Sequence, residues 1–478
     1  MAAQTGKHYL KSLRDGRRVF QGGRRIEDVT THSGFSRTAT TLADLYDLQH
    51  SSEHADVMTV DWEGERISRS YFPPATSEDL AGKRGNIQLW ADRTLGQMGR
   101  YPDFCAELAL GLLDAAEWLG QADRRFAGNA RTYHRWCAHN DLCLTHALND
   151  QFYDRSKSAA KQPDADLILH VVRETPEGPI VRGLRNLATL APLSHESLVY
   201  PNRPREADEA DYAICFAIAM NAPGLSIICR DLYAEHADPE RLPLSARFDE
   251  VDATLIFDDV LVPWDRVFVY RNPEMAAQFH RRINVWGGYS TLIRLLVRLE
   301  VFAGVAKLLS EWAGRSDPGA LLHLGRLIQD VEVLRACIGE AERGAFRTPA
   351  GFWAPRLSEA YRLEGIEASD RATRTLQDLL TSSLILTGGE SDLASGEIGP
   401  YVERFFKDQA PSTRDHLRLL AVAGDLVESA FGARNQLYER LQSGEPDNMR
   451  RRLASRSDTS AFTERVLRFI HDQWETPQ

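Results

Sequence analysis

The chain lacks an apolar segment long enough to cross a membrane. None of its 478 residues belongs to an apolar run of the roughly 18 residues that a spanning helix requires. Residues 1–11 contain no apolar core of a secretory signal. The six cysteines are spread from Cys105 to Cys337, which indicates buried thiols in a reducing compartment. We therefore expect a soluble, cytoplasmic protein with no membrane partner.

The common nucleotide-binding and hydrolase motifs are also missing. Without G-x-G-x-x-G there is no obvious Rossmann site for NAD(P)H, and without G-x-x-x-x-G-K-[ST] there is none for a nucleoside triphosphate. G-x-S-x-G and H-E-x-x-H do not occur either. These absences disfavour nicotinamide dehydrogenases, NTPases and the most familiar hydrolases.

Positive charge is in deficit, because 57 Lys and Arg residues face 68 Asp and Glu residues and the net charge is −11. Nucleic acids and anionic membranes select basic surfaces, so we expect neither as a partner. One stretch brings cysteine and histidine together, at Cys137, His139, Cys143 and His146. Its spacing matches no familiar zinc pattern, and small buried cysteines are common in protein cores. We therefore predict no metal site.

The spacing of apolar residues changes twice along the chain. It is mainly helical up to about residue 150, alternates with a period of two from about 160 to 270, and then becomes helical again. The expected helices are Gly6–Gly16, Thr41–His50, Phe104–Leu119, Ala130–Leu148, Gly288–Trp312, Ala320–Phe346, Ala368–Leu386 and Thr413–Leu441. The expected strands are Asp166–Glu174, Pro179–Gly183, Tyr212–Met220, Leu225–Cys229 and Ala253–Phe257.

This order predicts an antiparallel barrel or sandwich between two helical parts, with the four long helices forming a bundle. Charged residues on the long helices, such as Arg294 and Arg298, are expected on solvated faces or in subunit contacts.

The stretch Gly99–Phe104 joins an irregular segment to an apolar helical run. Pro102 is tolerated in a first helical turn, and Asp103 adds the negative charge that a helix start favours. Arg100 therefore stands just outside a helix entrance as a permanent cation. Such an arginine is ordinarily a solvated surface residue. A second stretch, Thr145–Asn149, is the reason to consider a functional role for it.

Taken together, these stretches resemble the 4-hydroxyphenylacetate 3-monooxygenase family, the oxygenase component of two-component, reduced-flavin-dependent phenol hydroxylases. The likeness covers nearly the whole chain, and the motifs keep the family's order and spacing. They are Tyr9–Arg17, Glu27–His32, Met98–Asp103, His146-Ala147 with Asp154-Arg155, Arg247–Glu250, Phe257–Trp264, and Phe431–Arg434 with Leu437–Glu439.

The resemblance implies an acyl-CoA dehydrogenase-like α+β fold in three parts. These are an N-terminal, mainly α domain at 1–150, a central antiparallel β-barrel domain at 151–272, and a C-terminal four-helix bundle and oligomerisation domain at 273–478. A homotetramer, arranged as a dimer of dimers, is implied as well. The implied cofactor is FAD, delivered as FADH2 by a separate NAD(P)H:flavin reductase, with molecular oxygen as co-substrate. A separate reductase would explain the missing dinucleotide motif.

The implied activity is flavin-dependent monooxygenation, EC 1.14.14-like, of a phenol ortho to its hydroxyl group by a flavin C4a-hydroperoxide. A phenol attacks the electrophilic oxygen best as phenolate, and a nearby cation lowers its pKa, near 10, by roughly one to three units. By resemblance, Arg100 is that cation and His146 accepts the phenol proton, both as catalytic and substrate-binding residues. A helix-cap arginine and a core histidine are the alternative interpretation.

The resemblance also places flavin contacts at Asp154, Arg155 and Thr189, and at the loop Ser443-Gly444, from a neighbouring subunit. For Thr189 the alternative is a strand hydroxyl bonded to the backbone. We expect a substrate cavity that excludes water, because the hydroperoxide must be kept from decaying to hydrogen peroxide.

The chain departs from the family at the substrate-binding residue Phe104. There, 4-hydroxyphenylacetate hydroxylases carry a tyrosine, so the ring is kept and a hydroxyl that would bond the substrate is lost. This leaves the phenolic substrate open between 4-hydroxyphenylacetate, a chlorophenol and a tyrosine-like unit, free or carrier-tethered.

Two other functions stay open. The same fold serves acyl-CoA dehydrogenases and dehydratases, but a related dehydratase holds an iron–sulfur cluster by three cysteines and a histidine, and no cysteine lies between residues 230 and 336. A non-catalytic scaffold would show no tight binding of reduced flavin.

Overall fold

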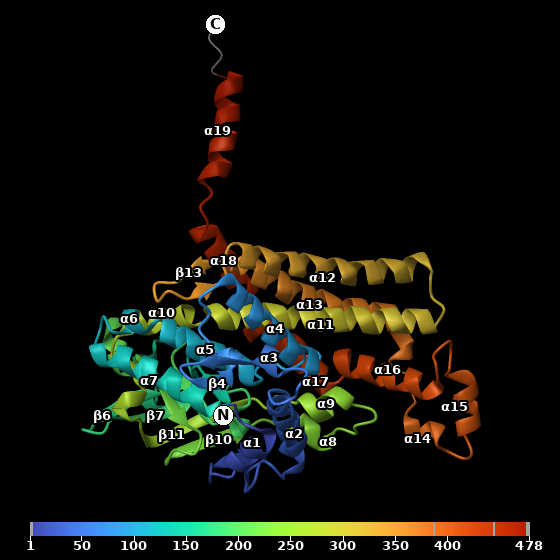
Figure 1. Ribbon diagram of the computed structural model, residues 1–478, viewed down its shortest axis with the longest axis horizontal. Helices are drawn as coiled ribbons and strands as arrows, with labels where there is room; N and C mark the ends of the chain where they lie inside the picture. The colour runs from blue at the N-terminus through green and yellow to red at the C-terminus, as the bar shows by residue number, and fades with distance from the viewer. Residues whose placement is uncertain (1–2, 386–387, 443–444, 475–478) are drawn as a thin grey trace.

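The computed structural model describes residues 3–385, 388–442 and 445–474. Long helices lie along one side of the molecule, the strands lie beneath one end of them, and the last helix projects away from the body (Figure 1). Within these ranges, no helix combines the length and apolar character needed to cross a membrane.

Helices dominate the first part of the chain, with one small hairpin among them. The helices are α1 (Gly6–Ser12), α2 (Ser33–Leu48), α3 (Ala55–Met58), α4 (Ser77–Arg93), α5 (Pro102–Asp114), α6 (Ala116–Leu119) and α7 (Arg124–Asn140). The hairpin pairs β3 (Thr59–Trp62) with β4 (Glu65–Ser68). α5 begins at Pro102, as the sequence predicts, and is buried along most of its length. It therefore holds the preceding Arg100 against the core.

The remaining long strands form two sheets. The six-stranded sheet has the order β2 (Arg24–Ile26), β1 (Val19–Gln21), β10 (Leu225–Cys229), β11 (Ala253–Leu261), β7 (Pro179–Arg185) and β6 (His170–Glu174). The four-stranded sheet has the order β12 (Val267–Tyr270), β9 (Ile214–Ala219), β8 (Glu196–Val199) and β5 (Leu144–Ala147). The short helices α8 (Tyr233–His236) and α9 (Pro243–Phe248) lie between β10 and β11 in the chain.

The predicted closed antiparallel barrel is wrong. Across the described ranges, no strand pairing joins the two sheets or closes either of them, and the pairs β1–β10 and β5–β8 are parallel. Phe216 of β9 and Phe257 of β11 meet edge to face between the sheets, with ring centroids 6.0 Å apart. An alternation of apolar and polar residues predicts strands with a buried face. Strands of a barrel and strands of two packed sheets show the same alternation, so it does not distinguish the two.

The helix predicted from Ala130 to Leu148 is wrong at its C-terminal end. α7 stops at Asn140, where Asp141 adopts the left-handed conformation with φ of 46° that often ends a helix. Leu144 to Ala147 then pair with β8 as a parallel strand. His146 therefore lies on a sheet and not on a helix face.

The last part of the chain is helical, apart from the small hairpin β13 (Phe346–Arg347) and β14 (Trp353–Ala354). Its helices are α10 (Pro273–Ile283), α11 (Val285–Trp312), α12 (Pro318–Arg343), α13 (Glu359–Leu380), α14 (Glu390–Leu393), α15 (Gly399–Phe405), α16 (Thr413–Val427), α17 (Ala430–Gln442), α18 (Pro446–Arg456) and α19 (Ser460–Trp474). α11, α12 and α13 lie side by side, and α16 packs against α11 and α13 (Figure 1).

Two predictions about these helices need correction. The single helix expected at Thr413–Leu441 is two helices, because the Ser429 hydroxyl donates to the Asp425 carbonyl and accepts from the Gly432 amide, which ends α16 and starts α17. Arg294 and Arg298 are not on a solvated face, since only 3% and 1% of their surfaces are exposed.

The close approach of α5 to α10 gives a stability test. A Cβ atom added at Gly111 of α5 would overlap the carbonyl group of Ile283, whereas one added at Gly128 of α7 would meet no atom within 4 Å. We expect Gly111→Ala to lower the free energy of unfolding by about 1–3 kcal/mol, because a packed core resists extra volume. Gly128→Ala should raise it by roughly 0.5–1 kcal/mol, through helix propensity. Urea unfolding compares the two variants, and equal effects would contradict this packing.

Candidate active site

A small cavity of about 40 Å3 lies where β5, α5, α10 and the long helices meet. Its lining comes from segments far apart in the sequence: Arg100, Phe104, His146, Leu148, His280, Asn284, Thr291, Arg294, Arg362 and Tyr438. This set of described residues contains arginines and histidines but no carboxylate. The cavity therefore favours a ligand group that carries negative charge.

A second, more open hollow of about 520 Å3 lies between α14, α15 and the start of α16. Residues of those helices and their connections line it, among them Ser395, Glu403 and Arg414. None of the predicted site residues that the structure describes lines it. We place the candidate site in the smaller cavity, because that is where the chemically capable side chains converge.

Arg100 enters the cavity without a carboxylate partner. Its guanidinium donates to the Gly99 carbonyl oxygen over 2.8 Å, and within the described ranges it makes no ion pair and its Nε has no hydrogen-bond partner. The guanidinium carbon lies 3.9 Å from the ring centroid of Phe104 and 5.3 Å from that of Tyr438. Two aromatic faces thus stabilise a buried cation whose charge is left for a ligand.

His146 faces Phe104 from β5, with ring centroids 5.7 Å apart. Its Nδ1 lies 2.7 Å from the Tyr200 hydroxyl, which leaves Nε2 for a ligand. Burial of the ring, and then the charge of Arg100, lower the pKa of His146 well below its usual value. His146 is therefore neutral near pH 7 and able to accept a proton.

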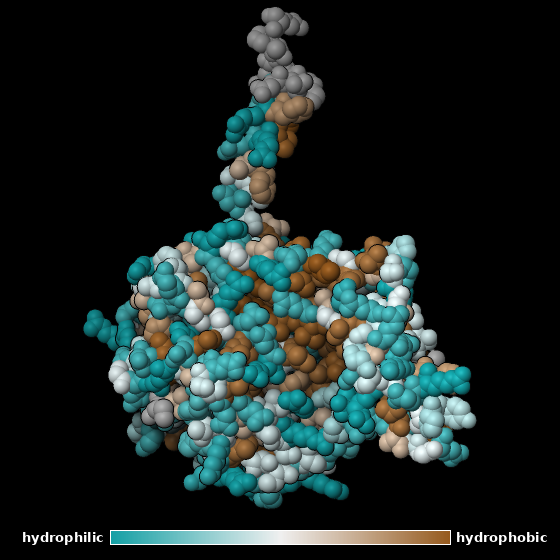
Figure 2. All heavy atoms as spheres, turned by 45° about the vertical axis from the view of Figure 1, so that its right-hand side comes forward, coloured by the Kyte–Doolittle hydropathy of each residue, from teal (hydrophilic) through white to brown (hydrophobic). Residues whose placement is uncertain are grey.

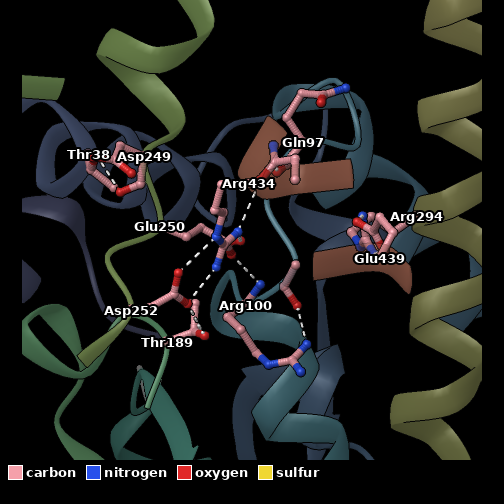
Figure 3. A network of polar contacts seen from close by, with 12 residues as sticks. Thr38, Gln97, Arg100, Thr189, Asp249, Glu250, Asp252, Arg294, Arg434 and Glu439 are labelled. Atoms are coloured by element: carbon pink, nitrogen blue, oxygen red, sulfur yellow. Dashed lines mark hydrogen bonds and ion pairs between the residues drawn. The ribbon is translucent and has the colours of Figure 1, made fainter. Parts of the chain in front are cut away.

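An ion-pair network fixes the backbone beside Arg100. The guanidinium of Arg434, on α17, donates to both carboxylate oxygens of Asp252 over 2.6 and 2.9 Å and to Glu250 over 3.2 Å. Glu250 in turn accepts the backbone N–H of Arg100, and Asp252 accepts the Thr189 hydroxyl over 2.7 Å. Figure 3 shows Arg434 between the two carboxylates, with Arg100 and Thr189 beyond them.

The charge of Arg434 also controls a carboxylate. Burial raises the pKa of Asp252, but the charge and hydrogen bonds of Arg434, with smaller contributions from the charge of Arg230 and the Thr189 hydroxyl, outweigh it and hold the pKa below its usual value. A bidentate pair of this kind orients both partners as well as neutralising them.

Tyr438 is packed between two arginines. Arg434 lies 4.2 Å from its ring centroid, on the same ring that Arg100 contacts. Burial keeps the pKa of Tyr438 above its usual value, so the phenol stays protonated. Its hydroxyl is buried and, across the described part of the chain, has no hydrogen-bond partner. Tyr438 is thus a hydrogen-bond donor available to a cavity ligand.

The structure brings together three of the predicted site residues: Arg100, Phe104 and His146 all line the cavity. Thr189 does not line the cavity: its hydroxyl donates to Asp252, which Arg434 also binds, and its carbonyl accepts the Thr145 hydroxyl over 2.6 Å.

Asp154 and Arg155 do not line the cavity. Asp154 accepts hydrogen bonds from Ser156 in the loop that follows β5, and Arg155 is exposed there. Ser443 and Gly444 lie outside the described residues. Within the described ranges, no three histidine, cysteine or acidic side chains gather as metal ligands.

Sequence reasoning missed several lining residues. Tyr438 was part of a recognised motif without a role, and His280 and Asn284 belong to no motif. Tyr200 follows β8 and reaches His146 only because β5 and β8 are adjacent. A periodicity analysis treats such residues as core, and only the tertiary contacts place them in the cavity or, for Tyr200, behind His146.

Two family models together cover most of the chain. The model described as 4-hydroxyphenylacetate 3-hydroxylase N terminal matches residues 5–269, and the C-terminal model matches residues 276–471. The chain is 33% identical to the 4-hydroxyphenylacetate 3-monooxygenase oxygenase component of Thermus thermophilus, over 98% of both chains. It is 36% identical to the pyoverdin chromophore biosynthetic protein PvcC of Pseudomonas aeruginosa, over 94% of this chain and 91% of that one.

Comparison with solved structures agrees with the family models. The oxygenase component of 4-hydroxyphenylacetate 3-monooxygenase, in complex with FAD and 4-hydroxyphenylacetate, superposes with a TM-score of 0.94 at 32% identity, over 99% of both chains. An archaeal 4-hydroxybutyryl-CoA dehydratase from N. maritimus superposes with a TM-score of 0.88 at 18% identity, over 98% of this chain and 95% of that one. The latter similarity concerns the fold alone, which is of the acyl-CoA dehydrogenase-like kind.

The lining fits an oxygen-bearing aromatic ligand. Two buried donors, the Arg100 Nε and the Tyr438 hydroxyl, lack partners among the described residues, and aromatic rings form the walls. Oxygen atoms of a phenol or of a flavin ring can supply those partners. A volume of about 40 Å3 is too small for either ring system, so the cavity has to widen on binding.

The ion pairs of Arg434 give a stability prediction. Arg434→Gln leaves Glu250 and Asp252 buried with one less cation, so we expect the free energy of unfolding at pH 7 to fall by about 3–5 kcal/mol. Because Arg434 lowers the pKa of Asp252, the stability from this pair is present above the unfolded-state pKa of Asp252. It is lost as pH falls through the lowered folded-state pKa, where the deficit should shrink.

The matched control is Arg418→Gln, which breaks an exposed ion pair with Glu390 and should leave stability nearly unchanged. Urea unfolding at several pH values makes the comparison. A similar small loss in both variants would show that the Arg434 pairs are energetically unimportant.

Proposed function

The chain belongs to the 4-hydroxyphenylacetate 3-hydroxylase family, and on this premise we propose that the cavity around Arg100 and His146 is its substrate site. The chain is the oxygenase component of a reduced-flavin-dependent phenol monooxygenase, with FAD as cofactor, oxygen as co-substrate and a separate flavin reductase. The observation that carries the site proposal is the Arg100 guanidinium, buried without a carboxylate partner among the described residues.

Arg100 prepares the phenol for attack. Reduced FAD, when bound, reacts with oxygen and supplies an electrophilic oxygen atom to the aromatic ring. A phenolate donates more charge to its ortho carbon than a phenol does, and an adjacent cation lowers a phenol pKa by roughly one to three units. Within the described lining there is no carboxylate to oppose that effect. Arg100 therefore binds the phenol oxygen and favours its ionised form.

His146 and Tyr438 complete the contacts to the phenol oxygen. Neutral His146 accepts the phenol proton at Nε2, since its Nδ1 is engaged with Tyr200. The Tyr438 hydroxyl donates a hydrogen bond to the resulting oxygen anion. It thereby replaces the hydroxyl that is lost with Phe104, whose ring stacks on Arg100 and keeps water from that side.

For the flavin we propose the contacts that the resemblance to the family implies. We place the flavin beside the cavity, with Thr189, Asp154 and Arg155 as contacts and the loop Ser443-Gly444 supplied by a neighbouring subunit. The position of Thr189 supports this arrangement, because its hydroxyl is oriented by Asp252, one contact from Arg434.

We propose that the chain is divided into three domains, formed by residues 1–150, 151–272 and 273–478. The helical content of the first and last parts and the strands of the middle part support it, although β1, β2 and β5 extend the two sheets from the first part. A cytoplasmic location is supported by the six cysteines, each of which is unpaired.

We also propose that the chain forms a homotetramer. α19 stands away from the body, yet it exposes Phe462, Val466, Leu467 and Ile470 at helical spacing. α11 and α12 expose a second apolar set, which contains Leu308, Leu321, Leu322, Ile328 and Val333. Apolar side chains gather on the face turned forward in Figure 2. Exposed sets of neighbouring apolar side chains are typical of subunit contacts.

Substitutions at the cavity test the site. Arg100→Ala and His146→Ala should each lower the rate of ring hydroxylation by about 10²–10⁴-fold, because each removes a group that acts on the phenol oxygen. FAD affinity should change much less. Hydroxylated product, hydrogen peroxide and FAD binding are measured for each variant, with the exposed Arg182→Ala as control. Unchanged coupling of flavin oxidation to hydroxylation in both cavity variants would remove these residues from the active site.

Substitutions on α19 test the assembly. A Phe462→Asp/Val466→Asp variant should dissociate the tetramer, because it places two charges on the apolar face. Arg465→Gln, on the same helix, should leave the assembly intact. Sedimentation velocity gives the mass of each species, and a monomeric wild type would refute the tetramer.

A further inference from the structure

Four side chains form a continuous hydrogen-bonded row along one wall of the cavity. His146 Nδ1 lies 2.7 Å from the Tyr200 hydroxyl, which lies 3.1 Å from Nδ1 of His280. Nε2 of His280 lies 3.2 Å from the side-chain amide of Asn284. The row joins β5, the segment after β8 and the end of α10. Both of its histidines line the cavity, but the proposed function uses only His146.

Ring packing holds the middle of the row in place. Tyr200 is fully buried and stacks on His280, with ring centroids 5.7 Å apart and an interplanar angle of 22°. It also packs against Phe279 at 5.2 Å and meets His146 edge-on at 6.0 Å. The tyrosine hydroxyl is therefore fixed between two imidazole nitrogens, a position in which it can accept one proton and donate another.

We infer that Tyr200 and His280 form a proton relay that carries the phenol proton away from His146. The inference rests on the proposed function, because it needs a phenol bound beside His146. It assigns Tyr200, which does not line the cavity, as a residue that acts through another.

Each step of the relay breaks one bond to hydrogen and forms another. The phenol O–H bond breaks, its electron pair stays on the phenolate oxygen, and the proton bonds to Nε2 of His146. His146 releases its Nδ1 proton to the Tyr200 oxygen, and Tyr200 passes its own hydroxyl proton to Nδ1 of His280. The outcome is a phenolate, a neutral His146, a neutral Tyr200 and an imidazolium at His280.

The surroundings of Asn284 support proton transfer from His146 towards His280. The Oδ1 atom of Asn284 is buried and has no hydrogen-bond partner within the described ranges, whereas the Nδ2 atom faces His280. The oxygen and nitrogen of an amide are interchangeable by a half-turn of the group. After that turn, Oδ1 accepts the Nε2 proton of His280, and Nδ1 of His280 becomes the acceptor that Tyr200 requires. His146 then carries its proton on Nδ1 and presents a free Nε2 lone pair to the phenol.

The charge of Arg100 acts on both histidines of the row. His146 lies beside Arg100, and burial with that charge lowers its pKa. Burial, with the charges of Arg362 and then Arg100, also lowers the pKa of His280, to about 4. His280, however, lies in the last turn of α10, where the helix dipole stabilises a cation. Transfer to His280 separates the proton from the phenolate that Arg100 holds, and so opposes its immediate return.

The test follows the ionisation of a coloured phenol. The full-length chain, with FAD present, is mixed rapidly with 4-nitrophenol at a pH where the free phenol is neutral, and formation of the bound phenolate is followed by absorbance. Tyr200→Phe keeps the ring and removes the hydroxyl, so we expect the phenolate to form about 10- to 100-fold more slowly. Tyr71→Phe, which removes a buried hydroxyl bonded to the Leu142 carbonyl, should match wild type.

A solvent isotope measurement separates a relay from a structural role. In mixtures of H2O and D2O, several protons in flight give wild type a curved dependence of rate on deuterium content, and Tyr200→Phe should give a linear one. His280→Gln provides a second variant if Tyr200→Phe fails to fold, with the same expectation. Equal rates and equally curved plots in the variants and wild type would overturn the relay alone. No phenolate formation by wild type would overturn the proposed substrate site, and the relay with it.

Discussion

The ion pairs of Arg434 with Glu250 and Asp252 join the parts of the chain that build the active site. Arg434 comes from a helix near the C-terminus, and the two carboxylates precede β11. Glu250 also accepts the backbone N–H of Arg100, so the same group positions the residue that we propose binds the phenol oxygen. Buried charges are costly unless each is paired and hydrogen-bonded. This requirement makes the arrangement specific, because few other placements of these segments would satisfy both carboxylates.

Arg100 differs from the other cavity arginines that the contacts describe in detail. Arg294 is neutralised by two hydrogen bonds of 2.7 Å to Glu439, whereas Arg100 has only the Gly99 carbonyl and two aromatic faces around its guanidinium. Aromatic rings stabilise a cation without cancelling its charge. The charge thus stays available for a phenolate. The neighbouring histidines remain neutral chiefly because they are buried, and the charge of Arg100 adds to that effect.

Much of this could be predicted from the sequence, and the failures have physical causes. Pro102 and an apolar run mark the start of a helix and put Arg100 just outside it, while the site roles of Arg100 and Phe104 came from the resemblance to the family. His146, also taken from the resemblance, lines the cavity but was wrongly placed on a helix, since a short buried strand has the same apolar composition as a buried helix end.

Long-range contacts set the limit of such predictions. Tyr200 and His280 are 80 positions apart and belong to no motif, and only the packing of α10 against the sheet brings them together. Likewise, an alternating pattern marks strands but does not say whether a sheet closes into a barrel. The Ser429 hydroxyl that divides α16 from α17 acts through local hydrogen bonds that apolar periodicity does not record.

The central claim is that the uncompensated charge of Arg100 ionises the bound phenol, and a titration tests it most directly. The absorbance of 4-nitrophenol bound to the chain is measured against pH, for wild type and for Arg100→Gln. The account predicts a bound pKa lowered by about one to three units in wild type and restored towards the free value in the variant. A bound pKa equal to the free value in wild type, or the same shift in both proteins, would contradict it.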